Sequence, residues 1–167
     1  EYLPLRKIFP NFSFLSDKID FKSGSKNQIF SLSNKLNFLP LICYEIIFHK
    51  YIAQKLNDKI NLIINITNDA WFGKTIGPHQ HLQFARIRSV EFGIPVARVA
   101  NTGISAFFSP YGEKILEIKL GERGVESSYM LEKLETTIYK RFGDGCFVIV
   151  LIYICFINIF AFKNRKS

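Results

Sequence analysis

The stretch LNFLPLICYEIIFHKYIAQKLND, residues 36–58, changes its apolar period part-way along. Residues 36–44 are an extended apolar run, and from residue 45 onward apolar side chains recur at near-helical spacing. We therefore predict a strand that leads directly into a helix, with Cys43 at the corner between them. Such a corner holds a side chain at the edge of a sheet, where nearby backbone N–H groups point toward anything that binds.

The segments around this corner predict further strands. QIFSLS, residues 28–33, forms a hairpin with the run 36–44 across a polar turn. NLIINIT, residues 61–67, is apolar on both faces, as expected for a sheet that is covered on both sides. A second hairpin joins residues 95–101 to residues 104–110.

Helices alternate with strands in the first part of the chain, and strands dominate later. A helix is predicted over residues 79–92, because Pro78 precedes it and Gly93 follows it. EKILEIKL, residues 113–120, is a further extended stretch. This order favours a layered α/β or α+β domain with a buried sheet.

The composition allows one domain of ordinary size. The chain has 167 residues, of which 48% are hydrophobic and 22% charged, so it is neither a disordered tail nor a coiled coil. Its net charge of +8 and 15% aromatic residues raise the question of nucleic acid. The aromatic residues do not interleave with Lys and Arg, so we predict no nucleic-acid partner.

Residues 146–162, CFVIVLIYICFINIFAF, carry no charge. A helix of that length reaches about 25 Å, near the short end for crossing a bilayer. We predict a transmembrane helix rather than a buried core helix, because core helices are seldom uncharged on every face. The other regions are then a domain over 1–139, a juxtamembrane linker 140–145 and a basic tail 163–167. The basic tail favours a cytoplasmic C-terminus, which would place the domain on the opposite side of the membrane.

The predicted domain contains a single cysteine, Cys43, since Cys146 and Cys155 belong to the apolar run. A lone thiol at a strand-to-helix corner is a candidate nucleophile, because a helix N-terminus stabilises the thiolate. Glu45 adds a carboxylate that would position the nucleophile or take a proton. On spacing alone, a catalytic and a buried structural cysteine both remain open.

The other polar residues considered do not indicate a binding or metal site. His79 and His81 lie two positions apart at the start of a helix and cannot face the same way, so no metal site is predicted. Arg86, Arg88 and Glu91 are expected to form a solvated or ion-paired helix face.

Three motifs together carry a family resemblance. LICYE at 41–45, NDAWFG at 68–73 and the long stretch 76–112, which contains ANTGISAFF, resemble the C-terminal half of the apolipoprotein N-acyltransferases. These are membrane-embedded members of the nitrilase (carbon–nitrogen hydrolase) superfamily. The resemblance covers nearly the whole chain. It implies part of a nitrilase-type α-β-β-α layered sandwich, followed by one C-terminal transmembrane helix.

The resemblance also implies a two-step acyl transfer without cofactor or metal. A cysteine thiolate takes a fatty acyl group from a phospholipid, and the α-amino group of an S-diacylglyceryl cysteine on a lipoprotein then accepts it. The implied partners are the phospholipid donor, the lipoprotein acceptor and the bilayer. The implied location is a bacterial inner membrane, with the domain on the periplasmic side.

The resemblance assigns roles to two groups of residues. In the corner, Cys43 matches the nucleophile, Tyr44 would offer its backbone N–H to the oxyanion, and Glu45 matches the glutamate that supports the nucleophile. The second group is expected to shape the pocket and lipid entry. Its members are Glu1, Trp71, Asn68 and Asp69.

The chain departs from the family pattern in one respect. The superfamily triad is glutamate, lysine and cysteine, and no residue here corresponds to the first two. We expect the chain to be a fragment that is inactive alone, since a base and an oxyanion stabiliser each contribute about 10²-fold or more. The missing N-terminal half is then a further partner. Two alternatives remain, a membrane-tethered nitrilase-type amidase and a non-catalytic remnant.

Overall fold

The structure is a computed structural model that describes residues 29–33 and 36–164. Within these residues the strands form one six-stranded sheet, in the same order as in the sequence. The elements are β1 (Phe30–Ser33), β2 (Leu36–Ile42), η1 (Cys43–Ile47), α1 (His49–Lys55), β3 (Leu62–Asn68), η2 (Ala70–Phe72), α2 (Gly77–Phe92), β4 (Val96–Asn101), β5 (Ser105–Phe108), β6 (Lys114–Ile118), α3 (Ile138–Phe142) and α4 (Gly145–Asn164).

The sheet is mixed. Its centre, β2–β3–β4, is parallel, and β1, β5 and β6 are added antiparallel to it. Parallel neighbours need a crossover connection, and here the crossovers are η1 with α1 between β2 and β3, and α2 between β3 and β4. Both hairpins predicted from the sequence, β1–β2 and β4–β5, are confirmed.

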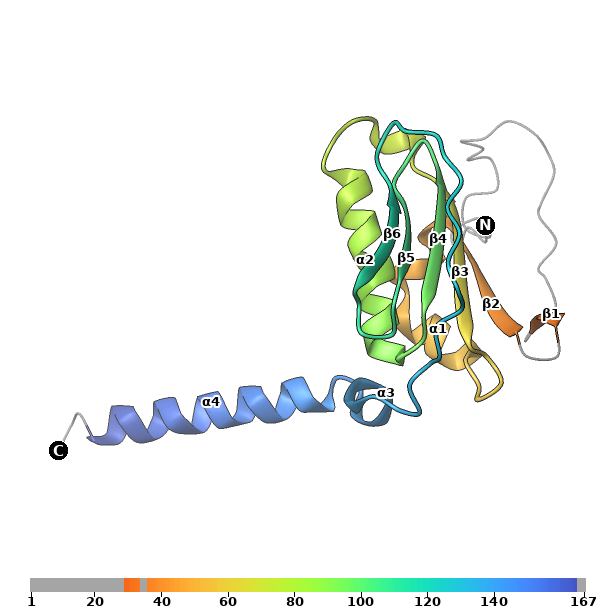
Figure 1. The fold of residues 1–167 in the computed structure, drawn as a ribbon. Helices are drawn as coiled ribbons and strands as arrows, with labels where there is room; N and C mark the ends of the chain where they lie inside the picture. The colour runs from red at the N-terminus through yellow and green to blue at the C-terminus, as the bar shows by residue number, and fades with distance from the viewer. Residues whose placement is uncertain (1–28, 34–35, 165–167) are drawn as a thin grey trace, which may run out of the picture.

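Helices α1 and α2, together with η1, cover one face of the sheet (Figure 1). Alternate strand residues point to that face, and they pack with the apolar sides of η1, α1 and α2 in one cluster. Members of the cluster with no more than 4% of their surface exposed include Leu39, Leu41, Ile46, Ile52, Ile63, Leu82, Phe92, Val96 and Phe108.

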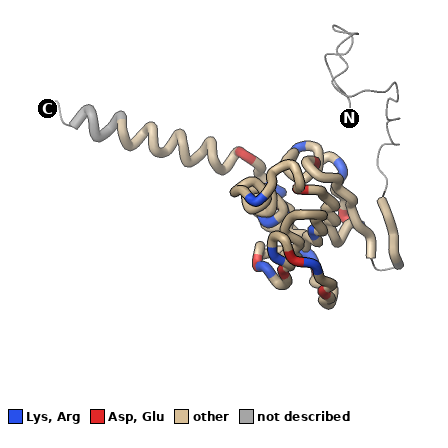
Figure 2. The backbone as a smooth tube through the Cα atoms, turned by 90° about the horizontal axis from the view of Figure 1, so that it is seen from above, with Lys and Arg blue, Asp and Glu red and all other residues tan. Residues whose placement is uncertain are grey.

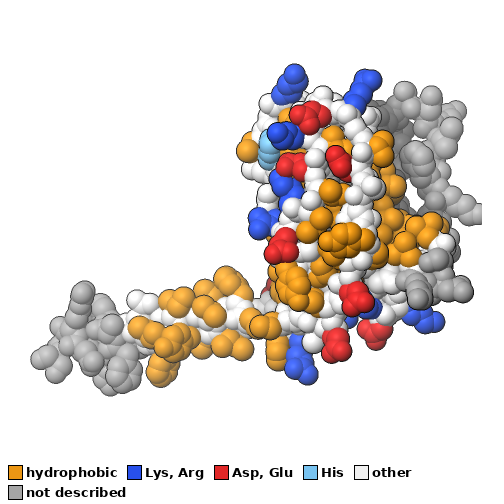
Figure 3. Space-filling model, viewed as in Figure 1, with side chains coloured by type: hydrophobic (Ala, Val, Ile, Leu, Met, Phe, Trp, Pro, Cys, Tyr) orange, Lys and Arg blue, Asp and Glu red, His pale blue; other side chains and the backbone are white. Residues whose placement is uncertain are grey.

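The opposite face, called here the open face, carries a row of exposed apolar residues. Ile42, Ile66 and Val99 lie next to one another on β2, β3 and β4 and are 58%, 52% and 58% exposed. Figure 3 shows hydrophobic side chains gathered on this side of the sheet. The sequence predicted a sheet covered on both faces, and in the described part of the chain helices cover only one. The prediction followed from the apolar pattern of residues 61–67, which does not say what provides the second cover.

The helix ends depart from prediction by small steps. Helix α2 begins at Gly77 rather than residue 79, with Pro78 in its first turn. It ends as predicted at Phe92, and Gly93 follows with φ of +63°, a left-handed conformation that favours glycine. The single helix predicted over 45–58 is instead a 3-10 turn and a short α-helix, because Phe48 leaves the helical conformation.

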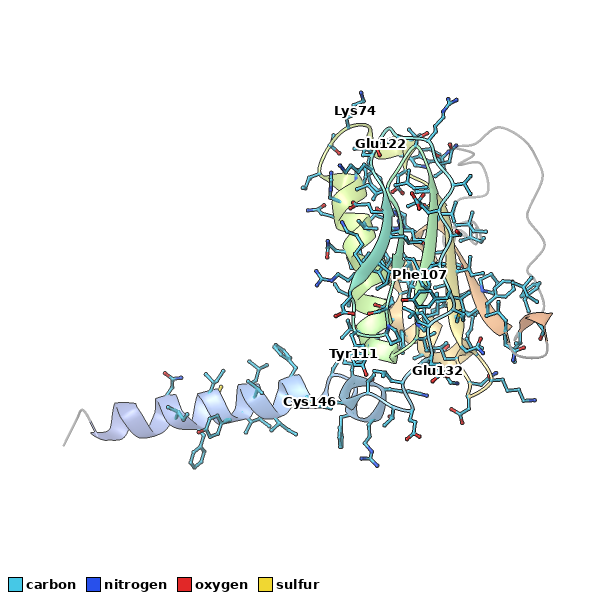
Figure 4. All side chains as sticks on the ribbon, in the orientation of Figure 1. Lys74, Phe107, Tyr111, Glu122, Glu132 and Cys146 are labelled. Carbon is cyan, nitrogen blue, oxygen red and sulfur yellow. The ribbon has the colours of Figure 1, made fainter. Side chains whose placement is uncertain are left out.

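Helix α4 extends away from the sheet (Figures 1 and 2). Cys146 marks its start in Figure 4, and large side chains from Phe147 to Ile157 are exposed around it. In the part of the chain that the structure describes, no helix reaches the length and apolar character that crossing a membrane requires. The transmembrane helix predicted at 146–162 is therefore unconfirmed.

Candidate active site

The corner after β2 has an unusual backbone. Cys43 follows the last residue of β2 and opens η1 with φ of +49°, in the left-handed region. Among described residues other than glycine, only Thr102 shares a positive φ. A side-chain-bearing residue in this region costs about 1–3 kcal/mol, so the surroundings must impose the conformation. The Cys43 side chain is partly exposed rather than sealed in the core.

The carboxylate of Glu45 is engaged by the corner itself. Its Oε2 accepts a hydrogen bond from the backbone N–H of Ile42 at 2.8 Å, and its Oε1 accepts one from the Tyr51 hydroxyl at 2.8 Å. Lys55 Nζ in turn donates to the Tyr51 oxygen. These contacts fix the turn that carries Cys43. The role of Glu45 in supporting the nucleophile stays a prediction.

The remaining predicted residues fall into different surroundings. Tyr44 is half exposed, and its ring stacks on His81 with centroids 5.2 Å apart. Trp71 is 85% exposed. Asn68 Oδ1 accepts from the N–H of Ala70 at 3.1 Å, as in a turn. Glu1 lies outside the described residues.

Asp69 belongs to a buried ionic network rather than to an exposed turn. Its side chain has no exposed surface, Oδ1 lies 2.8 Å from His81 Nδ1, and Oδ2 accepts from Arg98 Nη2 at 2.6 Å. Burial raises the pKa of Asp69, but the hydrogen bond with His81 and the charge of Arg98 lower it below its ordinary value. Asp69 is thus a charged group of the core.

Arg98 links this network to the corner. It too has no exposed side-chain surface, and its Nη1 donates to Asn65 Oδ1 at 2.6 Å. Burial lowers the pKa of Arg98, and the negative charges of Asp69 and of a Cys43 thiolate oppose that change. Asn65 Nδ2 then donates to the carbonyls of Leu41 and Cys43, at 3.1 and 3.2 Å.

Neither Asn65 nor Arg98 was singled out from the sequence. Each is a polar residue in the middle of an apolar strand, NLIINIT or VARVA, and this is the signal that was available. Their meeting depends on the parallel register of β3 and β4, which places them opposite each other.

Arg88 bears out the ion-paired alternative of a second prediction but not the solvated one. Expected on a solvated or ion-paired helix face, it keeps its ion pair with Glu91 but is 5% exposed. Its guanidinium donates to the carbonyls of Ile46 and Ile47 at 2.9 and 2.7 Å. Because Ile46 and Ile47 are the last residues of η1, these hydrogen bonds connect α2 to the segment that follows Cys43.

A cavity of about 840 Å³ lies on the open face, away from Cys43. Its walls are β4, β5 and β6 on one side, including Phe107 (labelled in Figure 4), and residues 121–130 on the other. Farther along, this segment is tied back by Lys133 Nζ, which donates to the carbonyl of Ile60 at 3.0 Å. The cavity does not include the corner, so it is not the site that the sequence predicted.

Comparison with known proteins identifies the family and the fold. The family model of the carbon–nitrogen hydrolases matches residues 7–129. The chain belongs to this family. The yeast protein Nit3 of the nitrilase superfamily, a solved structure, shares the fold with a TM-score of 0.50 at 20% identity, over 61% of this chain and 40% of that one.

Curated relatives with similar sequences belong to one group of carbon–nitrogen hydrolases, the apolipoprotein N-acyltransferases. The apolipoprotein N-acyltransferase of Rickettsia typhi is 40% identical over 159 residues, and that of Rhodopseudomonas palustris is 42% identical over 147. The alignments cover 95% and 86% of this chain, but only 32% and 27% of those proteins. The chain therefore spans about a third of the length of the curated relatives that it matches.

Proposed function

We propose that this chain is the nucleophile-bearing part of a lipoprotein N-acyltransferase. The observation that carries the proposal is the partly exposed Cys43 on a strained strand-to-helix corner, in a carbon–nitrogen hydrolase whose curated relatives are named apolipoprotein N-acyltransferases. A thiolate suits the task, because the thioester that it forms retains enough reactivity to acylate an amine.

Two balanced steps follow. The triad glutamate of a complementary part takes the thiol proton, and the Cys43 thiolate attacks the ester carbonyl of a phospholipid. The carbon–oxygen bond breaks, and the lysophospholipid leaves after its oxygen takes that proton back from the glutamate. The α-amino group of a diacylglyceryl lipoprotein then attacks the thioester. The carbon–sulfur bond breaks, the nitrogen gives its proton to the triad glutamate, and the thiolate is regenerated. We assign the backbone N–H of Tyr44 to the oxyanion of both intermediates.

The proposal requires a complementary part that supplies the triad glutamate and lysine. The open face supports this requirement, because it leaves Ile42, Ile66 and Val99 exposed directly beside the corner. A second sheet packed on this face would complete the α-β-β-α sandwich and bury the row. We expect the isolated chain to be inactive for this reason.

Helix α4 is proposed to place the site at the bilayer of the inner membrane. Its side chains from Phe147 to Ile157 are apolar and exposed, and the part of α4 that Figure 2 colours carries its charge only at the base of the helix. We keep the sequence-based proposal that residues 146–162 span the membrane, with the domain on the periplasmic side.

The experiment supplies the missing part and looks for the thioester. The full chain is combined with the preceding portion of the Rickettsia typhi relative in phosphatidylethanolamine vesicles, and intact mass is measured. We expect a fatty acyl adduct that maps to Cys43 and disappears in Cys43→Ala. A folded complex without the adduct would refute the proposal.

Removing residues 146–167 from this chain, in the same combination with the complementary part, distinguishes the transferase from an amidase. A lipid acyltransferase should lose most of its adduct formation on vesicles, because its donor is held in the bilayer. An amidase that acts on a soluble amide should keep its rate. Hydrolysis of a soluble amide at an unchanged rate, without any acyl adduct, would favour the amidase.

A further inference from the structure

The left-handed backbone of Cys43 needs a cause in its surroundings. An L-residue with φ of +49° is strained, and it relaxes unless neighbouring groups hold it. The proposed chemistry depends on this geometry, because the backbone conformation decides where the partly exposed thiol lies at the end of β2. The question is which groups hold the corner.

Asn65 is placed to hold it. It lies on β3, the strand next to β2, and is completely buried. Both of its amide hydrogens are used, since Nδ2 donates to the carbonyl of Leu41 at 3.1 Å and to that of Cys43 at 3.2 Å. These carbonyls lie on either side of Ile42, so one side chain fixes the backbone before and after the bend.

Arg98 sets the orientation of that amide. An asparagine side chain turned by half a revolution would present its oxygen to the two carbonyls and repel them. Arg98 prevents this, because its Nη1 donates to Asn65 Oδ1 at 2.6 Å. Its Nη2 is held by Asp69 at 2.6 Å, and its Nε donates to the Ile104 carbonyl at 3.3 Å, so the guanidinium itself cannot turn.

We propose that Asn65 and Arg98 are positioning residues that impose the left-handed conformation of Cys43, with Arg98 acting through the Asn65 amide. The inference rests on the proposed function for its consequence, because it matters for catalysis only if Cys43 is the nucleophile. Neither residue is proposed to touch the acyl group.

The test compares glycine with alanine at position 43 by thermal unfolding of the full chain in detergent. Glycine adopts a positive φ without strain, whereas alanine does not. If the surroundings impose φ, Cys43→Gly unfolds at a temperature about 3 °C above that of Cys43→Ala. The comparison is then repeated with Asn65→Ala added to both chains.

We call the hydrogen bonds from Asn65 to the carbonyls of Leu41 and Cys43, together with the Arg98 bond that orients Asn65, the clamp. Without the clamp the corner is free to relax, and the order of the two melting temperatures should reverse. Alanine then unfolds about 2 °C above glycine, because glycine loses more backbone entropy on folding. If Asn65 contributed only to general stability, Asn65→Ala would lower both melting temperatures equally and leave their difference unchanged. That result, or glycine below alanine in the chain with Asn65 intact, would overturn the proposal.

Two further variants keep the test decisive. Ile60→Ala removes a buried side chain that lies before β3, at the opposite end of that strand from the corner, and should lower both melting temperatures without changing their order. If the Asn65→Ala chains do not unfold cooperatively, Arg98→Lys takes their place. It keeps a charge for Asp69 and removes the fork that reaches Asn65.

This measurement involves no substrate. A missing acyl adduct would therefore refute the proposed function and leave the order of unfolding as it is. Unchanged order would refute the clamp, and an acyl adduct on Cys43 would still stand.

Discussion

At the scale of single residues, the carboxylate of Asp69 links the stability of the site to pH. Burial raises its pKa, but His81 and Arg98 lower it below the ordinary value of 3.8. A carboxyl group of this kind adds stability above its unfolded pKa and loses it as the pH falls through the folded value. We expect Asp69→Asn to melt below the wild type at neutral pH, and the gap to shrink below about pH 3.8.

Circular dichroism melts from about pH 7 to about pH 3 would measure this gap. Asp58→Asn is the matched control, because Asp58 is 99% exposed and its removal should leave no comparable gap. A gap for Asp69→Asn that stayed constant over the whole range would contradict the assignment of Asp69 as a charged core residue.

The residues of the site differ in how far the sequence could predict them. The corner at Cys43 depends on a local change of period, which is visible in the sequence. The clamp depends on Asn65 and Arg98 meeting across two strands, and only the register of the sheet decides that. The pocket role predicted for Asp69 came from the family resemblance alone. Its contact with His81 was not predictable, because it joins residues of two different elements 12 positions apart.

At the scale of elements, the turn between β4 and β5 is held against the end of β3 by close packing. A Cβ on Gly103 would lie 2.7 Å from Asp69 Oδ2 and 2.8 Å from the Cβ of Ala100. Gly103→Ala should therefore lower the free energy of unfolding by about 1–3 kcal/mol. Gly124→Ala is the control, since its added Cβ would meet Ile118 at an ordinary 3.7 Å. Urea unfolding curves measure both, and equal midpoints would contradict the predicted clash.

Some features of the helices and strands are determined by neighbouring residues in the sequence, and others by contacts between distant segments. Hairpins and the end of α2 were predictable, because polar turns and Gly93 act within a few residues of sequence. The break at Phe48 was not, because η1 is fastened by tertiary contacts. Arg88 reaches its carbonyls from α2, about 40 positions along the chain, as its bond to Ile47 spans 41 residues.

At the scale of the whole molecule, the open face is the surface on which the proposed function requires a second layer. The open face places its exposed isoleucine and valine beside the corner, where a second layer would have to pack for the triad to assemble. Ile66 lies at the centre of this row and is 52% exposed, while Ile87 on α2 is 44% exposed. The two isoleucines are therefore a matched pair, one on the sheet and one on the helical layer.

Substituting each isoleucine by glutamate tests whether the open face is an interface. Ile66→Glu should change the melting temperature of this chain little, because the residue faces solvent in it. It should abolish acylation of Cys43 when the complementary part is present, since burying an unpaired carboxylate between layers costs several kcal/mol. Ile87→Glu should retain acylation. Co-elution of the two parts on size exclusion, followed by intact mass, measures both effects, and unimpaired assembly of Ile66→Glu would mean that the second layer packs elsewhere.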